Sequence, residues 1–196
     1  RPAALPLILC VLLFAGCASQ PEKPARLPLR GFSLAMPAEI RHERTWVVAQ
    51  HTPERLILGK PGRFDGESFA LQAFLVQLPP FRSDEALQQY AQTAQRREMD
   101  AARFRVVRHE VMPYDKGTGR CALSHLEVED RGDPSATGPA VNMRLETLTL
   151  TCAHPQNAAA GINVAYLHRH FPEDRDPRFL ETGTLLLKGL DYEANP

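Results

Sequence analysis

Runs of alternating apolar and polar residues dominate the chain from about residue 31 onward. They are rich in β-branched, aromatic and Leu residues and end at turn residues, a pattern that indicates β-strands. Because the connections between the runs are short, we expect most neighbouring strands to be antiparallel. The pattern predicts eight strands, over residues 32–36, 45–50, 55–59, 68–78, 104–112, 121–128, 143–152 and 162–171.

Two stretches have a helical period instead. The first, residues 83–102, opens with Ser83 as N-cap and two acidic residues that complement the helix dipole. Its apolar stripe comprises Leu87, Tyr90, Ala91 and Ala94. The second starts at Asp176, with Pro177 at the first helical position, and we expect it to end near Tyr192. One face of this helix, expected to pack on the sheet, carries Phe179, Gly183, Leu186, Leu187 and Leu190.

These elements predict an α+β fold, in which a mainly antiparallel β-sheet of about eight strands packs with two amphipathic helices. The chain has 196 residues, of which 43% are hydrophobic and 23% are charged, the composition of an ordinary globular protein. We therefore expect a single α/β domain over residues 31–196.

The N-terminal stretch departs from this pattern. Residues 3–15 form an uncharged apolar run. It is shorter than the roughly 20 residues of a transmembrane helix and is typical of the h-region of an export signal. The run leads into Phe14-Ala15-Gly16-Cys17, which resembles the lipobox of bacterial lipoproteins, although that family usually has Leu in place of Phe14. The resemblance implies a signal peptide over residues 1–16 and lipidation of Cys17 with acyl chains such as palmitate.

Two further expectations concern the location of the exported domain. Cys17 is followed by Ala18 rather than Asp. By resemblance to enterobacterial lipoproteins, this favours the outer membrane, with the domain facing the periplasm. Residues 17–30 contain three Pro and no apolar periodicity, which is typical of an extended tether.

The charge balance narrows the range of partners. Removal of residues 1–16 takes away only Arg1, so 22 basic residues face 23 acidic ones and the formal net charge is −1. This balance gives no electrostatic reason to expect a nucleic acid as partner. The expected contacts are the membrane, through the lipid anchor at Cys17, and an envelope protein.

The cysteines divide into two groups. Cys10 lies in the predicted signal and Cys17 is assigned to lipid, which leaves Cys121 and Cys152 in the exported domain. In an oxidising compartment such a pair most simply forms a disulfide. Both lie in predicted strands separated by a loop rich in Gly, Pro and Ser, and pairing about the centre of that loop places them directly opposite each other. A redox-active or metal-binding pair is the alternative, but the close CxxC spacing is missing.

His168 and His170 are weak candidates for metal ligands. Alternate residues of a strand share a face, so both imidazoles are able to reach one Zn ion, with Glu173 nearby. A third ligand from His125 is not expected, because pairing about a loop centred near residue 156 places His168 on the opposite face. A one-residue change of register would reverse this. The position of the pair at a strand end favours solvent contact, and we expect no metal and no cofactor.

The sequence shows no arrangement typical of nucleophilic catalysis. It contains no GxSxG or GxGxxG motif, and Ser124 and His125 are strand neighbours that point to opposite faces and cannot form a dyad. Arg96-Arg97 and the acidic run at residues 173–176 are typical of solvated surface. Phe81 is expected to pack on the first helix as a hydrophobic staple, with an exposed partner contact as the alternative.

The order of elements resembles a known type of domain. The strand Gly31-Phe32-Ser33-Leu34-Ala35-Met36-Pro37, a hairpin, a long strand through residues 71–78, a central helix, further antiparallel strands and an amphipathic C-terminal helix are similar to the PsbP/DcrB type of α/β domain. Proteins of that type are mostly non-enzymatic accessory or binding proteins.

The function that we expect is that of a non-enzymatic envelope lipoprotein, tethered to the membrane through Cys17 and binding a protein or a small ligand. Two alternatives stay open. One is a periplasmic inhibitor or immunity protein that neutralises a toxin or hydrolase. The other is a metal-dependent enzyme that uses His168 and His170.

Overall fold

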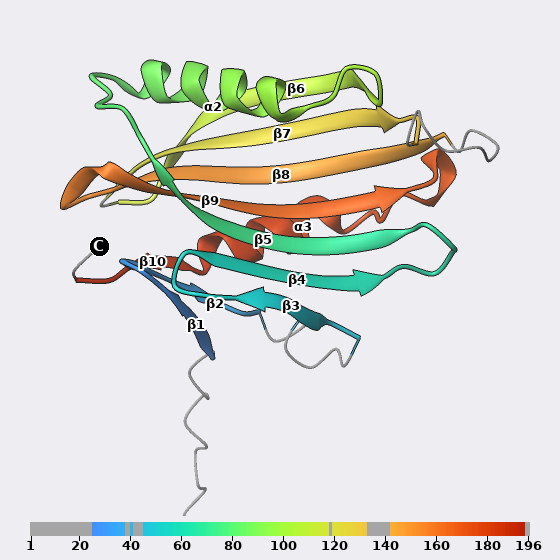
Figure 1. Cartoon of the computed structure of the whole chain (residues 1–196), viewed down its shortest axis with the longest axis horizontal. Coiled ribbons are helices and arrows are strands. Elements are labelled where there is room, and N and C mark those ends of the chain that lie inside the picture. The colour runs from blue at the N-terminus through green and yellow to red at the C-terminus, as the bar shows by residue number, and fades with distance from the viewer. Residues whose placement is uncertain (1–24, 38–39, 41–44, 118, 133–141, 195–196) are drawn as a thin grey trace, which may run out of the picture.

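The computed structural model describes residues 25–37, 40, 45–117, 119–132 and 142–194. The predicted signal peptide over residues 1–16, the predicted lipidation site Cys17 and residues 18–24 lie outside the described residues. Within the described part the chain is an α+β protein, as predicted, with two antiparallel sheets and two α-helices (Figure 1). No helix in this part is long and apolar enough to cross a membrane.

The larger sheet has seven antiparallel strands in the order β3-β4-β5-β9-β8-β7-β6. β9, the last strand of this sheet in chain order, therefore lies at its centre, between β5 and β8 (Figure 1). In chain order the strands are β3 (Val47–His51), β4 (Arg55–Pro61), β5 (Ser68–Gln77), β6 (Phe104–Asp115), β7 (Arg120–Asp130), β8 (Met143–His154) and β9 (Asn157–His170). A short 3₁₀ turn, η1 (Pro172–Asp174), follows β9.

A smaller sheet brings the two ends of the described chain together. Its order is β1-β2-β10, so that β2 pairs with the first and the last strand at once. The strands are β1 (Arg26–Leu29), β2 (Phe32–Ala35) and β10 (Leu190–Tyr192). The sequence interpretation missed β1 and β10.

β1 corrects the predicted tether. Residues 26–29 were assigned to the tether of residues 17–30, but they pair with β2 and belong to the folded domain. Pro28 concealed this strand, because proline cannot donate a hydrogen bond to a ladder. An edge strand tolerates such a residue, and β1 is an edge strand. Leu29 is buried in the core, which holds the strand in place.

β10 corrects the predicted end of the second helix. α3 (Phe179–Lys188) is followed by Gly189, and Leu190 begins β10 instead of continuing the helix to Tyr192. Leu190 pairs with Leu34 of β2, and both side chains are fully buried. The apolar period continues across the boundary because Leu190 contacts the same core as the helix, so the pattern alone could not locate the end of the helix.

The first predicted helix is α2 (Asp84–Glu98), which ends about a turn earlier than expected. The hydroxyl of Ser83 accepts a hydrogen bond from the first turn at 3.2 Å, which confirms the predicted N-cap. Leu87 is buried against Ala122 of β7, and Phe81 packs on the same cluster, in agreement with the predicted staple. α2 therefore covers one face of β6 and β7.

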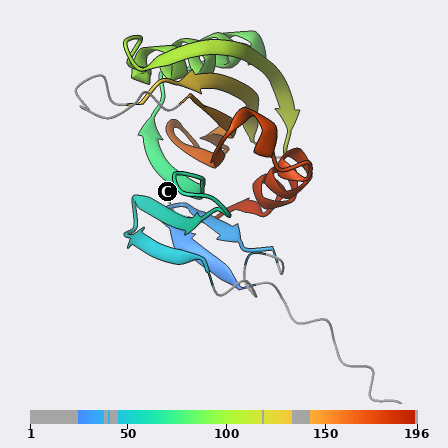
Figure 2. The same ribbon diagram turned by 90° about the vertical axis from the view of Figure 1, so that its right-hand side faces the viewer.

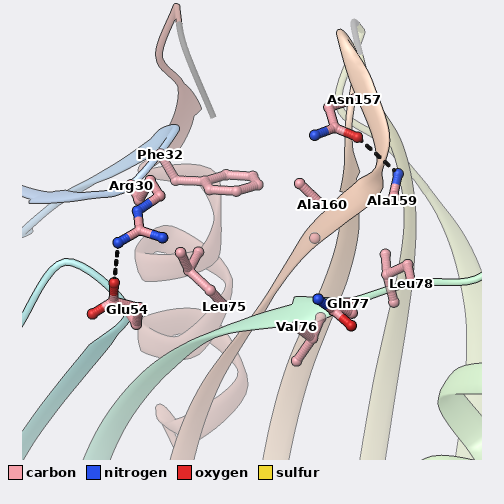
Figure 3. A pocket seen from close by; sticks show the side chains of 11 residues that line it. Arg30, Phe32, Glu54, Leu75, Val76, Gln77, Leu78, Asn157, Ala159 and Ala160 are labelled. Atoms are coloured by element: carbon pink, nitrogen blue, oxygen red, sulfur yellow. Dashed lines mark hydrogen bonds and ion pairs between the residues drawn. The ribbon is translucent and has the colours of Figure 1, made fainter.

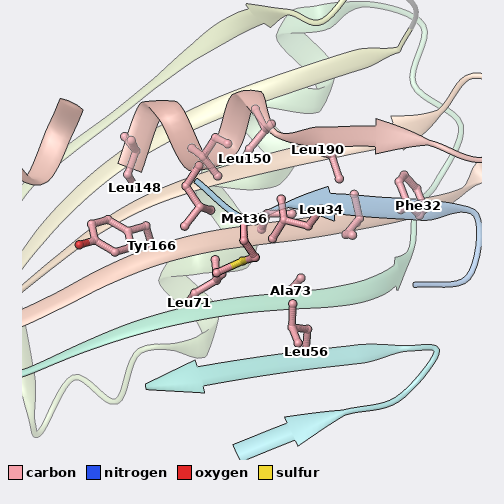
Figure 4. Packing of buried hydrophobic residues seen from close by; sticks show 14 of the residues in the cluster. Phe32, Leu34, Met36, Leu56, Leu71, Ala73, Leu148, Leu150, Tyr166 and Leu190 are labelled. Carbon is pink, nitrogen blue, oxygen red and sulfur yellow. The ribbon is translucent and has the colours of Figure 1, made fainter. Parts of the chain in front are cut away.

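The main core lies on the opposite face of the larger sheet, under α3 and the smaller sheet (Figures 2 and 4). Leu34 of β2 packs there together with Leu148 of β8 and Tyr166 of β9. Gly183 allows α3 to approach the sheet closely, because a Cβ at this position would lie 3.0 Å from Leu148 and 3.1 Å from Tyr166. The core fixes how the smaller sheet sits at the end of the larger one.

Candidate functional site

An apolar hollow opens at the end of the larger sheet where β5 ends and β9 begins (Figure 3). Its volume is about 630 Å³, which lies within the range of roughly 300–1,000 Å³ typical of small-molecule sites. The β1–β2 turn borders one side, and the start of β9 borders the other. The apolar wall comprises Phe32, Leu75, Val76, Leu78, Ala159, Ala160 and Gly161.

The backbone polar groups of β5 that face β9 along this wall are paired with those of β9. Val76 is opposite Gly161 in the β5–β9 ladder, and the flanking residues continue the pairing. Just beyond the ladder, the N–H of Leu78 donates to the carbonyl oxygen of Ala159 at 3.0 Å. The wall therefore favours a ligand through apolar contact rather than through backbone hydrogen bonds.

Gly161 shapes the floor of the apolar hollow. A Cβ at this position would lie 2.3 Å from Cδ1 of Leu78 and 2.9 Å from the carbonyl oxygen of Cys152. Leu78 thus lies directly over the bare backbone of β9, where it is buried. A larger residue at 161 would displace Leu78 and change the shape of the wall.

The rim of the apolar hollow is polar (Figure 3). Arg30, in the β1–β2 turn, donates from Nη2 to Oε1 of Glu54 in the β3–β4 turn, and the two side chains are 60% and 50% exposed. Gln77 and Asn157 also line the rim, and Oδ1 of Asn157 accepts a hydrogen bond from the N–H of Ala159 at 3.2 Å. The hollow combines a hydrocarbon interior with a cation and an anion side by side at its mouth.

A second, shallower hollow adjoins the first at Arg30. Its volume is about 510 Å³, and its lining comprises Pro28, Leu29, Arg30, His51, Thr52 and Pro53. Because Arg30 lines both hollows, the ion pair of Arg30 and Glu54 stands between them.

The opposite end of the larger sheet holds buried acidic side chains, each with basic partners. Glu146 of β8 is 1% exposed, and its carboxylate accepts a hydrogen bond from Nε2 of His125 and two from Arg175, all at 2.7 Å. Burial by itself raises the pKa of this carboxyl, but the hydrogen bonds from His125 and Arg175 outweigh it and lower the pKa to about 2. Glu146 is therefore a fixed anion at neutral pH.

Asp130 of β7 is held in the same way. Its carboxylate accepts hydrogen bonds from Arg103 at 2.7 and 2.8 Å and from Arg169 at 2.7 Å. The hydrogen bond from Arg103 is the main reason why the pKa of Asp130 lies well below its ordinary value of 3.8. The ion pair of Asp130 with Arg169 connects the end of β7 with the end of β9.

The third buried acid is Glu67, just before β5, which accepts a hydrogen bond from Nε2 of His168 at 3.0 Å. Burial lowers the pKa of His168, so its imidazole is neutral at neutral pH and donates from Nε2. Burial alone would raise the pKa of Glu67, but the hydrogen bonds from His168 and from the amides of Arg63 and Phe64 lower it. A neutral histidine therefore faces an ionised glutamate.

A polar hollow of about 540 Å³ lies beside these pairs, between the β4–β5 turn and residues 173–178. Its ionisable lining residues are Lys60, Arg63, Arg175 and Arg178, and Glu67, Glu173, Asp174 and Asp176. General acid–base catalysis needs a group whose pKa lies near the working pH. Of these residues, Glu67 is held ionised by its hydrogen bonds, and Arg175 is paired with Glu146.

The structure places His168 and His170 on one face of β9, as expected, and one nitrogen of each ring lies within hydrogen-bond distance of a protein oxygen. The ring of His168 stacks between Phe69, at a centroid distance of 4.0 Å, and His170, at 4.5 Å. Nδ1 of His170 lies 2.6 Å from the carbonyl oxygen of Phe171. Among the described residues, no three His, Cys, Asp or Glu side chains are placed to hold a metal ion.

The position of His125 corrects the sequence interpretation. His125 and His168 were expected on opposite faces of the sheet, but both lie on the face that α3 covers. At the β8–β9 turn His154 pairs with Asn157, a register that would place the two histidines on opposite faces if it continued. An irregularity between Ala153 and His154 shifts the register and reverses the faces.

Two other sequence predictions are confirmed. Ser124 and His125 point to opposite faces: the hydroxyl of Ser124 donates to Gln95 of α2, whereas His125 contacts Glu146 on the other face. Cys121 and Cys152 are directly opposite in the β7–β8 ladder and form a disulfide, with their Cα atoms 4.2 Å apart.

Sequence reasoning missed the apolar hollow and the buried anion Glu146. The hollow unites residues from four separate segments, and no local pattern records how the smaller sheet docks. Glu146 did leave a signal, because it has the same strand parity as Leu148, Leu150 and Cys152, which line the core. An ionisable residue in an otherwise apolar series predicts a buried ion pair.

No family model matches the chain, and no curated protein matches its sequence. Similar solved structures include the Ran-binding protein Mog1p of Saccharomyces cerevisiae, with 8% identity and a TM-score of 0.47, covering 86% of this chain and 95% of that one. A mutant of Mog1 gives 8% identity, a TM-score of 0.46 and the same coverage. At these TM-scores the similarity bears on neither ligand nor partner, and the PsbP/DcrB resemblance stays a prediction.

Proposed function

We propose that the chain is a lipid-anchored, non-enzymatic binding domain of the bacterial envelope, and that the apolar hollow is its binding site. The observation that carries this proposal is the hydrocarbon wall of the hollow, where the backbone polar groups between β5 and β9 are already paired. Apolar surface of this kind gains free energy when a ligand displaces water from it.

The proposed location rests on two independent features. The lipobox-like residues 14–17 follow an apolar run of signal-peptide length. The disulfide between Cys121 and Cys152 suits an oxidising compartment such as the periplasm. Ala18 favours attachment to the outer membrane.

The proposal of a non-enzymatic role rests on the charged end of the sheet. There the buried carboxylates of Glu67, Asp130 and Glu146 are all held in hydrogen-bonded pairs with His or Arg. Such pairs fix elements of the fold, and they hold the carboxylates ionised rather than ready to exchange a proton near neutral pH.

The anchor is tested by feeding an alkyne-bearing palmitate analogue to cells that express the full chain. We expect the chain to take up the label and Cys17→Ser to lose it. Cys10→Ser is the matched control and should keep the label, because Cys10 lies in the predicted signal peptide. Label that persists in Cys17→Ser would refute the anchor.

The binding site is tested on the intact protein in envelope membranes with a diazirine-bearing alkyl alcohol as a general apolar probe. We expect photo-adducts on residues 75–78 and 159–161. Ala160→Trp fills the hollow from a partly exposed position and should abolish them. Val107→Trp, on the exposed edge strand β6, is the control and should leave them unchanged. Adducts that survive Ala160→Trp would contradict this assignment.

A further inference from the structure

The interior of the apolar hollow selects for hydrocarbon over peptide. A bound peptide strand needs hydrogen-bond partners for its own backbone. Between β5 and β9 these partners are already used, by the pairing of Val76 with Gly161 and by the hydrogen bond from Leu78 to Ala159. The side chains of Phe32, Leu75 and Val76 add only apolar atoms. An unbranched aliphatic chain needs no hydrogen bonds and fits such a wall.

The mouth of the hollow selects for a headgroup that carries both charges. Arg30 donates to Glu54 through Nη2. The side chain of Arg30 is 60% exposed, and that of Glu54 is 50% exposed. An ion pair between exposed side chains is held weakly, so an incoming group can contact either partner. The guanidinium of Arg30 suits a phosphate, which it can bind through two parallel hydrogen bonds. Glu54 beside it repels a purely anionic head but attracts an ammonium group.

The length of the tether places membrane lipids within reach. Under the proposed function the lipid is attached to Cys17, and Ala25 follows it by only eight Cα–Cα steps. Fully extended, they span at most about 29 Å. β1 then leads directly to Arg30 at the mouth of the hollow. The amphiphiles nearest to the hollow are therefore those of the bilayer to which the domain is tied.

We propose that the apolar hollow binds the acyl chain of a zwitterionic single-chain phospholipid, with its phosphate on Arg30 and its ammonium group on Glu54. This assignment rests on the proposed function and names the ligand class of the same site. The shallower hollow on the other side of Arg30 leaves room for the headgroup to approach the ion pair.

The test compares two photoactivatable lipids with the same diazirine-bearing acyl chain, a lysophosphatidylethanolamine and a monoacylglycerol, added to envelope membranes that contain the full chain. Adducts are located by peptide mass spectrometry. We expect the lysophospholipid to label residues 75–78 and 159–161 about tenfold more efficiently, as one or two charge-assisted hydrogen bonds imply. The double variant Arg30→Gln/Glu54→Gln should label equally with both lipids.

A matched control neutralises one exposed base and one exposed acid at the polar hollow, as Arg63→Gln/Glu173→Gln, and should keep the tenfold preference. Circular dichroism and the thermal midpoint verify that each variant folds. Equal labelling by the two lipids in the unaltered chain, or a preference that survives Arg30→Gln/Glu54→Gln, would overturn the assignment. If the general alkyl probe labels the hollow and the zwitterionic lipid shows no preference, this inference fails and the proposed function stands. If neither labels it, both fail.

Discussion

The hydroxyl of Tyr192 lies 3.3 Å from Sγ of Cys121, so the last strand of the chain rests against the disulfide. The ring of Tyr192 also packs edge-on against His154, at a centroid distance of 5.7 Å, and at a tilt against Phe32, at 5.6 Å. These contacts connect β10 of the smaller sheet with β8 and with the start of β7. Docking of the C-terminal strand and the disulfide therefore support each other.

Alkaline pH should weaken this contact. Burial raises the pKa of Tyr192 from its ordinary value of 10.0 to about 12. Folding thus favours the protonated hydroxyl, and its contribution is present in full below pH 10 and is lost as the pH rises from 10 to about 12. We expect the urea midpoint of the chain to fall across this interval, and to fall less in Tyr192→Phe. An equal fall in both proteins would rule out Tyr192 as the cause.

Loss of the disulfide should destabilise the domain measurably. The bond closes a loop with a sequence separation of 31 residues between Cys121 and Cys152, for which the chain-entropy model gives roughly 3–4 kcal/mol. We expect Cys121→Ala/Cys152→Ala to lower the free energy of unfolding by about this amount. Addition of a reductant should lower that of the unaltered chain similarly and leave the variant unchanged. In a chain whose Cys10 and Cys17 are replaced by Ser, two titratable thiols in the unreduced, denatured protein would show that the bond does not form.

Removal of the buried carboxylate of Glu146 should lower the free energy of unfolding. Glu146→Gln takes away the carboxylate that holds His125 and Arg175. Since breaking a buried ion pair typically costs 3–5 kcal/mol, we expect a loss of about 3 kcal/mol in the free energy of unfolding by urea. Glu181→Gln changes an exposed glutamate on α3 and should alter stability by less than about 0.5 kcal/mol. Comparable losses in the two variants would mean that Glu146 is not held as the structure shows.

Acid should destabilise the domain in two stages. Burial lowers the pKa of His168, so below pH 6.5 the unfolded chain takes up a proton that the folded protein resists, and stability starts to fall. The second stage comes from the carboxyls, whose pKa values are lowered in the folded protein. The stabilisation by Glu146 is present above pH 4.5 and is lost as the pH falls toward 2, an amount of about 3 kcal/mol. Glu67 and Asp130 act in the same direction.

The measurement is the urea midpoint as a function of pH, from neutral pH down to pH 3. We expect a shallow decline below pH 6.5 and a steeper one below 4.5. His168→Phe keeps the stacked ring geometry and should flatten the first stage, and Glu146→Gln should reduce the second. A midpoint that stays constant down to pH 3 would contradict the charge assignments at this end of the sheet.

Most of the strands could be predicted from the sequence, because apolar and polar residues alternate wherever one face of a strand is buried. The pairing of Cys121 with Cys152 was predictable for the same reason, since the hairpin around them is regular from end to end. The relation of His125 to His168 was not, because the irregularity after Ala153 changes the register of the next hairpin. A pattern of period two carries no record of a shift between strands.

The candidate site was harder to foresee than the fold. Phe32, Leu75 and Ala160 all read as ordinary core residues, and what makes them a wall is the incomplete coverage of the sheet end by the smaller sheet. Arg30 was assigned to the predicted tether of residues 17–30, and Glu54 lies between two predicted strands. Their meeting depends on how two hairpins dock, a long-range outcome of packing that no local spacing expresses.

The antiparallel pairing of β1 with β2 also determines which hydrogen bonds of the domain break first under a pulling force. A pull transmitted along the chain acts first on Ala25, whose carbonyl oxygen accepts a hydrogen bond from Met36, and then on Arg26, which is paired with Ala35 at the open end of the β1–β2 hairpin. In that geometry the backbone hydrogen bonds between β1 and β2 break one after another, because the force acts on one bond at a time. β1 would detach from β2 as far as Arg30 while β2 stayed paired with β10. Tension on the tether would therefore displace Arg30 at the mouth of the apolar hollow before it disturbed the core.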